Sequence, residues 1–330
     1  MKIGVVGGTG TISTSVVTGL VERGHDVTCI TRGLSGSVAA GARALVGDRN
    51  DLDWFIPAVR AASFDAGIDF ISYQPEQARA SLEAFRGVGR FVHTSTVATI
   101  GDEFDWLPAT EEHELRPTHP YGTNKLTIDR MYQAAYFAED FPVTILKPST
   151  TYGQSKVIRQ IGWDTTWVDR IRRGRPIVKI GEGRQLHHLL HADDAALGYA
   201  GVLDYDHCIG QTYHLVNPLH TTWDEVHRTA MRLLGREVEQ VSVPTETLYA
   251  LDPQRFMLVP GVLARNQLFT AAKLQRDVPD YRPTVSLESG YARAFEELDR
   301  TAGVESSPAG GWEDRVIDEQ RRAARRILAG

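Results

Sequence analysis

The feature that most constrains the fold is a glycine-rich turn near the N-terminus, Gly7–Ser13, with the sequence Gly-Gly-Thr-Gly-Thr-Ile-Ser. The short apolar run Lys2–Val6 precedes it and has the pattern of a buried strand, while the residues after it, up to about Gly24, have the pattern of a helix. Glycines between a strand and a helix let the backbone approach a pyrophosphate, whose charge the helix N-terminal amides and the helix dipole stabilise. We therefore predict a dinucleotide site that includes Gly7, Thr9, Gly10, Thr11 and Ile12.

Strand-like and helix-like segments alternate along the first 150 residues. Strands are expected at Lys2–Val6, Asp26–Thr31, Ala42–Val46, Ala66–Ile71, Arg90–His93 and Val143–Leu146, and helices after Gly10, around Trp54–Val59, at Pro75–Phe85 and at Tyr121–Ala138. Strands separated by helices imply parallel pairing with right-handed crossovers. The sequence therefore predicts an α/β fold, with a doubly wound parallel Rossmann sheet and a smaller, mostly helical C-terminal substrate domain.

The pattern is looser beyond Gly153. Helices are expected at Thr165–Arg173, Trp223–Leu234 and Leu287–Leu298, and strands at Ile177–Ile180 and Thr212–Val216. The Gly-, Ser- and Pro-rich stretch Gly303–Gly311 is expected to link these elements to a final helix. Arginines 321, 322, 325 and 326 would form a solvated face of that helix. We assign residues 1–153 and about 186–219 to an NADP-binding domain, and about 154–185 and 220–330 to a substrate-binding domain.

Composition excludes several functional classes. The formal net charge of -6 disfavours a nucleic-acid partner held by a strong positive field. No apolar run approaches the roughly 18 residues that span a bilayer. The N-terminus also lacks the apolar core of a signal peptide. With two cysteines, Cys29 and Cys208, the chain is not expected to carry a disulfide framework, and a cytoplasmic location is expected.

The end of the second predicted strand indicates which nicotinamide cofactor is used. NAD-selective sites usually place a carboxylate there, to accept hydrogen bonds from the ribose hydroxyls. Here the strand ends in Thr31-Arg32-Gly33, and Arg32 can form charge-assisted bonds to a 2′-phosphate, which favours NADP(H). Asp48 is expected to accept a bond from the adenine amino group. Arg49 is the next candidate for reading the phosphate.

Tyr121 and Lys125 are four residues apart on a predicted helix and therefore share a face. An ammonium near a phenol favours the phenolate, so Lys125 is expected to lower the pKa of Tyr121 from about 10. The same lysine can hydrogen-bond the nicotinamide ribose. Thr94-Ser95-Thr96 follows a strand, at the edge where such sheets bind ligands, and supplies hydroxyl groups.

Together these features resemble the extended short-chain dehydrogenase/reductases, which include NAD(P)-dependent epimerases, dehydratases and ketoreductases. The resemblance covers about residues 1–217, and it includes Lys147-Pro-Ser-Thr-Thr-Tyr-Gly153 and Leu190-His-Ala-Asp-Asp194. The run Val46–Arg49 is most similar to the branch that contains chloroplast stem-loop-binding proteins and their bacterial relatives.

The resemblance implies a role for each matching residue. Thr96 would be the catalytic Ser/Thr, Tyr121 the acid/base and Lys125 its partner. The cofactor would also contact Thr94, and Pro148 and Thr150 would lie beside the nicotinamide. Substrate contacts are expected from Thr96, Thr150 and Tyr152.

The sequence departs from the motifs of this family at two places, and both departures limit the reactions and substrates that are expected. Val97 and Ala98 follow Thr96, where the 4,6-dehydratases have an Asp-Glu pair, so elimination is not expected by the usual route. Thr150 stands where many nucleotide-sugar enzymes have asparagine, which weakens the expectation of a diphosphosugar substrate.

The group His187, His188, His191, Asp193 and Asp194 has side chains that bind divalent metals. A metal site is not expected, because this stretch matches a metal-free junction of the family. Alternation along a strand would also send the adjacent His187 and His188 to opposite faces.

Three hypotheses remain open. The first is an NADP(H)-dependent ketoreductase acting on a sugar-like or secondary-metabolite carbonyl, and the second is an NAD(P)-dependent sugar epimerase. The third is a non-catalytic nucleotide-sensing or RNA-binding protein. Substrate specificity should depend on segments 155–184 and 221–283. The aromatic residues Tyr152, Trp163 and Trp167 either line the substrate pocket or belong to the hydrophobic core. A homodimer through the helix that carries Tyr121 is possible by resemblance.

Overall fold

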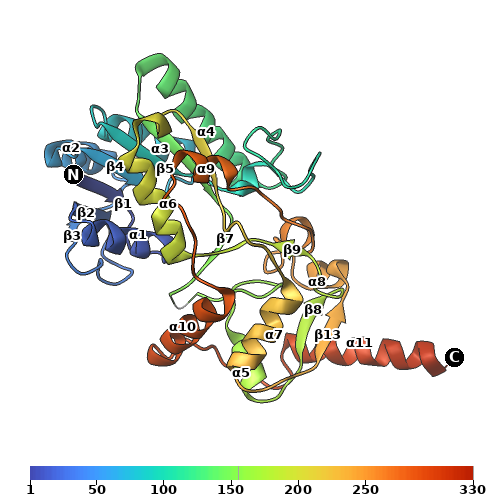
Figure 1. Ribbon diagram of the computed structural model, residues 1–330. Coiled ribbons are helices and arrows are strands. Elements are labelled where there is room, and N and C mark those ends of the chain that lie inside the picture. Colours follow the sequence, from blue (N-terminus) through green and yellow to red (C-terminus); the bar gives the residue numbers. More distant parts are fainter. Residues whose placement is uncertain (155, 330) are drawn as a thin grey trace. The chain divides into compact units, whose positions relative to one another are not determined.

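The computed structural model describes residues 1–154 and 156–329, and this part of the chain divides into two units (Figure 1). Unit 1 comprises Met1–Thr151, Leu190–Pro218 and Phe269–Thr284. Unit 2 comprises Tyr152–Leu189, Leu219–Leu268 and Val285–Gly330.

A parallel sheet of seven strands is formed by the described residues of unit 1, in the order β11-β6-β5-β4-β1-β2-β3. The strands are β1 (Lys2–Val6), β2 (Asp26–Thr31), β3 (Arg43–Val46), β4 (Ala66–Asp69), β5 (Arg90–Thr94), β6 (Val143–Pro148) and β11 (Thr212–Leu215). Every neighbouring pair is parallel. This order confirms the doubly wound Rossmann fold predicted from the sequence.

Helices cover both faces of this sheet (Figure 1). They are α1 (Thr11–Glu22), α2 (Leu52–Ala62), α3 (Pro75–Ala84), α4 (Pro120–Glu139), α6 (Ala192–Asp204) and α9 (Ala272–Asp277), with short 3₁₀ turns at Val97–Thr99 and Asp206–Cys208. Side chains alternate along each strand, so the adjacent Val5 and Val6 enter different cores. The Val5 core contains residues of α1 and α6, and the Val6 core contains residues of α2, α3 and α4. Burial on both faces explains why these strands are almost continuously apolar.

Unit 2 combines helices with two short sheets in its described residues. Its elements are α5 (Thr166–Arg172), β8 (Ile177–Ile180), β9 (Leu186–His187), β12 (Thr221–Thr222), α7 (Trp223–Leu233), β13 (Gln240–Val243), α8 (Thr245–Leu251), a π-helical turn (Val259–Leu263), α10 (Leu287–Arg300) and α11 (Trp312–Ala329). β8 pairs with β13 in parallel, and β9 pairs with β12 in antiparallel. The core includes Trp167, Trp223 and Tyr291, each 0% exposed. Two further strands, β7 (Thr150–Tyr152) and β10 (Leu189–His191), lie where the chain passes between the units.

The segment Phe269–Thr284 belongs to unit 1, whereas we had expected it in the substrate domain. Leu274, Val278 and Tyr281 are buried in the core of unit 1, and Tyr281 Oη donates a hydrogen bond to the Val216 carbonyl at 2.8 Å. The segment carries no glycine turn or strand alternation, so its sequence gave no sign of this return. Among the described residues, no helix has both the length and the apolar content to cross a bilayer.

Candidate active site

The glycine turn joins β1 to α1. Gly7 and Gly8 have φ of 107° and 111°, a region that residues with a side chain rarely adopt. A Cβ on Gly8 would also lie 2.6 Å from Cys29 Sγ on β2. Ser13, at the position of a third glycine, accepts a hydrogen bond from the Gly10 amide at 2.9 Å. Because these glycines have no side chains, nothing from them covers the N-terminus of α1. The first backbone amides of that helix have no acceptor within the helix and can bind a ligand.

Arg32 lies directly after β2 and is exposed. Among the described residues its guanidinium has no hydrogen-bond or ion-pair partner, so it is available for an anion. Asp48 is also exposed, and its carboxylate accepts bonds from the Asn50 amide at 2.9 Å and from Asn50 Nδ2 at 3.0 Å.

The structure does not support Arg49 as a second phosphate ligand. Its guanidinium is buried and donates to both Asp69 carboxylate oxygens, at 2.9 and 3.0 Å, and to Ser81 Oγ at 3.1 Å. Burial alone would raise the pKa of Asp69, but Arg49 and the neighbouring hydroxyl groups outweigh it and hold that pKa below its usual value. Arg49 therefore holds the end of β4 in place.

The segment after β5 carries the hydroxyl groups predicted for catalysis. Thr96 lies close enough to Tyr121 to lower the pKa of its phenol, and Thr96 Oγ1 accepts a hydrogen bond from the Ala98 amide at 3.2 Å. Thr94 is buried and already engaged: its hydroxyl accepts from Tyr199 Oη at 2.8 Å, and its carbonyl accepts from Lys125 Nζ at 2.7 Å. The structure thus brings Thr96, Tyr121 and Lys125 to the carboxyl edge of the sheet.

The pKa of Tyr121 moves in the direction opposite to our expectation. Burial, reinforced by Tyr73, raises it to about 12, and Thr96 opposes this rise only in part. The ammonium that was expected to lower it donates instead to the Thr94 carbonyl. Burial also lowers the pKa of Lys125 to about 8. The direction of this shift favours the protonated phenol, although Tyr121 is 42% exposed in this structure.

Asp129 lies one helical turn beyond Lys125 on α4 and is 1% exposed. Its Oδ2 accepts from Lys147 Nζ at 2.7 Å and from Ser95 Oγ at 2.9 Å. Burial works against its charge, but Lys147 holds the pKa of Asp129 far below the usual value. We did not predict this pair, although its four-residue spacing from Lys125 places Asp129 on the face that carries Tyr121.

Lys147 also connects this ion pair to the catalytic turn. Its Nζ donates to Thr99 Oγ1 at 2.6 Å, and Thr99 Oγ1 donates to the Thr96 carbonyl at 3.0 Å. The buried Lys147 ammonium therefore holds the segment that carries Thr96 in place through Thr99.

The later motif residues occupy different environments. Pro148 ends β6 and is buried, and Thr150 is half-buried at the end of unit 1. Tyr152 is 1% exposed and packs in the core of unit 2, its ring centroid 5.1 Å from that of Tyr291. This corrects its expected contact with substrate. Trp167 is likewise a core residue.

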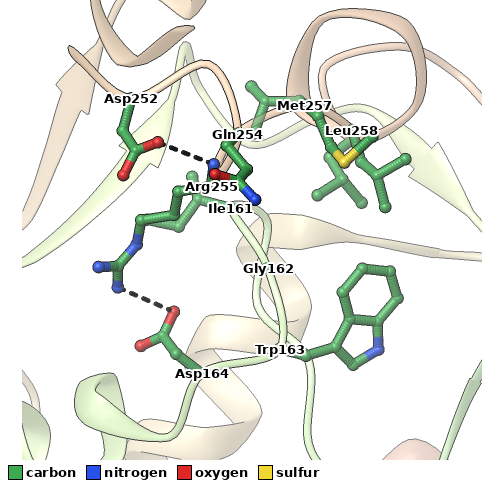
Figure 2. A pocket seen from close by; sticks show the side chains of 11 residues that line it. Ile161, Gly162, Trp163, Asp164, Asp252, Gln254, Arg255, Met257 and Leu258 are labelled. Atoms are coloured by element: carbon green, nitrogen blue, oxygen red, sulfur yellow. Dashed lines mark hydrogen bonds and ion pairs between the residues drawn. The ribbon is translucent and has the colours of Figure 1, made fainter.

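A cavity of about 560 Å³ lies within unit 2 (Figure 2). Its walls come from residues within 161–164 and 252–263, and these ranges lie inside the two segments expected to govern specificity. Residue 155, with which the first of the two segments begins, lies outside the described residues. Trp163 is on one side of the cavity, and Arg255 and Asp164, whose charged atoms are 3.9 Å apart, are on another (Figure 2). Of the three aromatic candidates, Trp163 is the one that lines this cavity.

The histidine-rich stretch has structural contacts. The His187 ring packs 4.5 Å from the Trp223 ring, and burial lowers the pKa of His187 to about 3. His191 Nδ1 accepts from the Asp193 amide at 3.1 Å and so caps α6. The described residues hold no group of three or more His, Cys, Asp or Glu side chains arranged to bind a metal ion.

The parallel sheet, the glycine turn after β1 and the Tyr–Lys spacing on α4 define a Rossmann-type α/β protein. The model of the NAD dependent epimerase/dehydratase family matches residues 3–214, and the chain therefore belongs to this nicotinamide-dinucleotide-dependent family.

Relatives in this family include both reductases and epimerases. The chain is 29% identical to 2′-dehydrokanamycin reductase of Streptomyces kanamyceticus over 285 residues, which cover 86% of this chain and 80% of the relative. It is 25% identical to the chloroplast stem-loop binding protein of 41 kDa b of Arabidopsis thaliana, over 71% of this chain and 63% of that protein. Its fold is similar to that of UDP-glucose 4-epimerase from Thermotoga maritima in complex with UDP-glucose, with a TM-score of 0.76, 19% identity, and coverage of 92% of this chain and 100% of that one.

Proposed function

We propose that the protein is an NADP(H)-dependent ketoreductase that reduces a carbonyl group on a sugar-like or secondary-metabolite substrate. The observation that carries this proposal is the placement of Tyr121 beside Thr96, one helical turn from Lys125, whose Nζ binds the Thr94 carbonyl at 2.7 Å. The similarity to 2′-dehydrokanamycin reductase over 86% of the chain supports a keto-sugar as substrate.

The residues present fit a dinucleotide phosphate. The positive φ angles of Gly7 and Gly8 leave the N-terminus of α1 open, where helix amides would bind the pyrophosphate. Arg32 has no partner among the described residues and would meet a 2′-phosphate, which supports NADP(H) over NAD(H). Unit 1 would therefore be the cofactor-binding unit and unit 2 the substrate-binding unit.

The reaction follows from the positions of the hydroxyl groups. Bound NADPH would supply the hydride. Thr96 and Tyr121 would donate hydrogen bonds to the carbonyl oxygen, which becomes more negative as the reaction proceeds. Tyr121 would then transfer its phenolic proton to that oxygen. Lys125 would stabilise the phenolate that remains and hydrogen-bond the cofactor ribose.

The raised pKa of Tyr121 supports reduction as the forward reaction. A group that must give up a proton has to hold it at the start, and a phenol with a pKa of about 12 does so at neutral pH. An epimerase begins instead by oxidising an alcohol, for which it needs a base. The same neutral phenol would be poorly suited to that first step.

The epimerase remains the second candidate, because the family and the similarity to UDP-glucose 4-epimerase favour it. Tightly retained NAD, with no net oxidation of NADPH, would support epimerisation.

The similarity to a chloroplast stem-loop binding protein leaves RNA binding as a third outcome, which the net charge of -6 opposes. Tight RNA binding that weakens steeply with salt would support it.

The proposal is tested by following NADPH oxidation with a panel of keto-sugars, including 2′-dehydrokanamycin. We expect Tyr121→Phe to lower kcat by about two to four orders of magnitude, because the substrate oxygen loses its proton donor. Tyr136→Phe is the matched control, since it removes the same hydroxyl from the same helix and should keep wild-type turnover. Near-normal turnover of Tyr121→Phe with NADPH still bound would disprove the assignment of Tyr121.

A further inference from the structure

Tyr73 lies in the turn between β4 and α3, and none of the sequence motifs includes it. Its amide donates to Gln77 Oε1 at 2.8 Å, in the first turn of α3. The next residue, Gln74, accepts a bond from Asn124 Nδ2 of α4 at 3.1 Å. The turn is therefore attached to two helices, and the backbone of Tyr73 has a defined place beside α4.

The Tyr73 ring lies beside both members of the catalytic pair. Lys125 Nζ is 4.9 Å from its centroid, within the distance at which a cation is attracted to the face of an aromatic ring. The Tyr121 ring centroid is 6.4 Å away. Since Lys125 Nζ also donates to the Thr94 carbonyl at 2.7 Å, the ammonium is held between a carbonyl and an aromatic ring.

Lys125 is sensitive to small changes in its surroundings. It is 1% exposed, and burial lowers its pKa to about 8, so its charge changes within the range in which enzymes work. Two carboxylates near it favour the ammonium: Asp69 at the end of β4 and Asp129 on α4. Arg49, before α2, opposes it. The other titratable groups around it are His93, Tyr73 and Tyr121. A contact that favours the charged form therefore alters how much ammonium is present at a given pH.

We propose that Tyr73 is a positioning residue whose ring holds the Lys125 ammonium in place and favours its charged form, and thereby acts on Tyr121. This inference rests on the proposed reductase function for its catalytic meaning, whereas the contact itself can be tested without activity. Tyr73 is 46% exposed, so its replacement leaves no cavity in the core.

The test compares Tyr73→Leu, which removes the aromatic face, with Tyr73→Phe, which keeps the ring and removes only the hydroxyl. The chain has six lysines, so the Cε signal of Lys125 can be followed by NMR in lysine-labelled protein and assigned with Lys125→Arg. We expect Lys125 to titrate at the same pH in the wild type and Tyr73→Phe, and about half a pH unit lower in Tyr73→Leu. The Lys125 Hε protons should also lose their ring-current shift in Tyr73→Leu alone.

Turnover provides the second measurement. Reduction should fail at high pH as Lys125 loses its proton, and this limb of the kcat profile should move to lower pH in Tyr73→Leu but not in Tyr73→Phe. Tyr249→Leu, at a tyrosine of similar exposure (44%) on α8, should leave both measurements unchanged.

An unchanged Lys125 titration in Tyr73→Leu would overturn the inference. So would a Tyr73→Phe variant that behaves like Tyr73→Leu, because the hydroxyl rather than the ring would then be responsible. If the wild type reduces none of the carbonyl compounds tested, the proposed function fails, and the NMR titration still decides the role of Tyr73.

Discussion

Two buried ion pairs, one in each unit, use different cations: a lysine in unit 1 and an arginine in unit 2. In unit 1, Lys147 and Asp129, 4% and 2% exposed, lie directly beneath the turn that carries Thr96. In unit 2, Arg159 and Glu313, 0% and 3% exposed, join the start of α11 to the loop before α5. The first pair supports the turn that carries a proposed catalytic residue, and the second attaches α11 to the loop before α5.

The choice of cation matches these roles. Arginine stays charged at any pH that a folded protein encounters, and its planar group makes several directed bonds. Arg159 indeed donates to both Glu313 and Asp164. Lysine can give up its proton when its surroundings demand it. Unit 1 also buries the arginine pair Arg49–Asp69, so the contrast is between the two pairs and not between the units.

The largest effect is expected from breaking the arginine pair. Glu313→Gln leaves Arg159 buried and still charged, and we expect a loss of about 3 to 5 kcal/mol in the free energy of unfolding. The loss should be the same from pH 7 to pH 10, since arginine cannot shed its proton. Denaturant titrations at several pH values measure it, with Glu297→Gln, which breaks an exposed pair with Arg300, as a control that should cost at most about 1 kcal/mol. A pH-dependent loss in Glu313→Gln would contradict the interpretation.

Asp129→Asn should cost less, and by an amount that changes with pH. A lysine, unlike an arginine, can be buried without its proton, so we expect the loss in the free energy of unfolding to become smaller as pH rises toward 10. Near pH 7 we expect a loss of about 2 to 4 kcal/mol, because the lysine must either stay charged without a partner or release its proton. The same denaturant series measures this. A deficit as flat as that of Glu313→Gln would remove the distinction between the lysine pair and the arginine pair.

The smallest of the three effects concerns an arginine that has no partner among the described residues. Arg32→Ala should weaken NADPH binding by about one to two powers of ten and leave NADH binding unchanged, since one charge-assisted contact to the 2′-phosphate is lost. The wild type should bind NADPH at least about tenfold more tightly than NADH. Fluorescence titration of both cofactors measures these affinities. Arg23→Ala, which breaks the exposed pair with Asp204, is the control. Equal affinities in the wild type would show that Arg32 does not select the cofactor.

Local sequence patterns were sufficient for most of unit 1. The predicted bounds Lys2–Val6 and Asp26–Thr31 are those of β1 and β2, because buried parallel strands are continuous apolar runs that turn residues interrupt. In unit 2 the short strand Gln240–Val243 was not predicted, because its apolar and polar residues give a weak pattern and its partner β8 is distant in sequence. The expected family membership was confirmed by the match over residues 3–214.

The site was predicted less completely, because its charges depend on partners brought together by the fold. Arg49 was the next candidate after Arg32 for reading the phosphate, but its buried partner Asp69 lies twenty residues further on. The shift in the pKa of Tyr121 had the wrong sign, because sequence spacing placed Lys125 near the phenol without revealing the competing Thr94 carbonyl. Tyr73 belongs to no motif and is connected to the site only through contacts with α4.

The return of Phe269–Thr284 to unit 1 has a consequence for how the protein is made. Leu274 and Tyr281 complete the core around α6 and β11, yet they are synthesised after most of unit 2. During synthesis, the first 218 residues therefore emerge before these core side chains. We expect an N-terminal fragment that ends at residue 218 to lack part of its own core and to expose apolar side chains beside Val216.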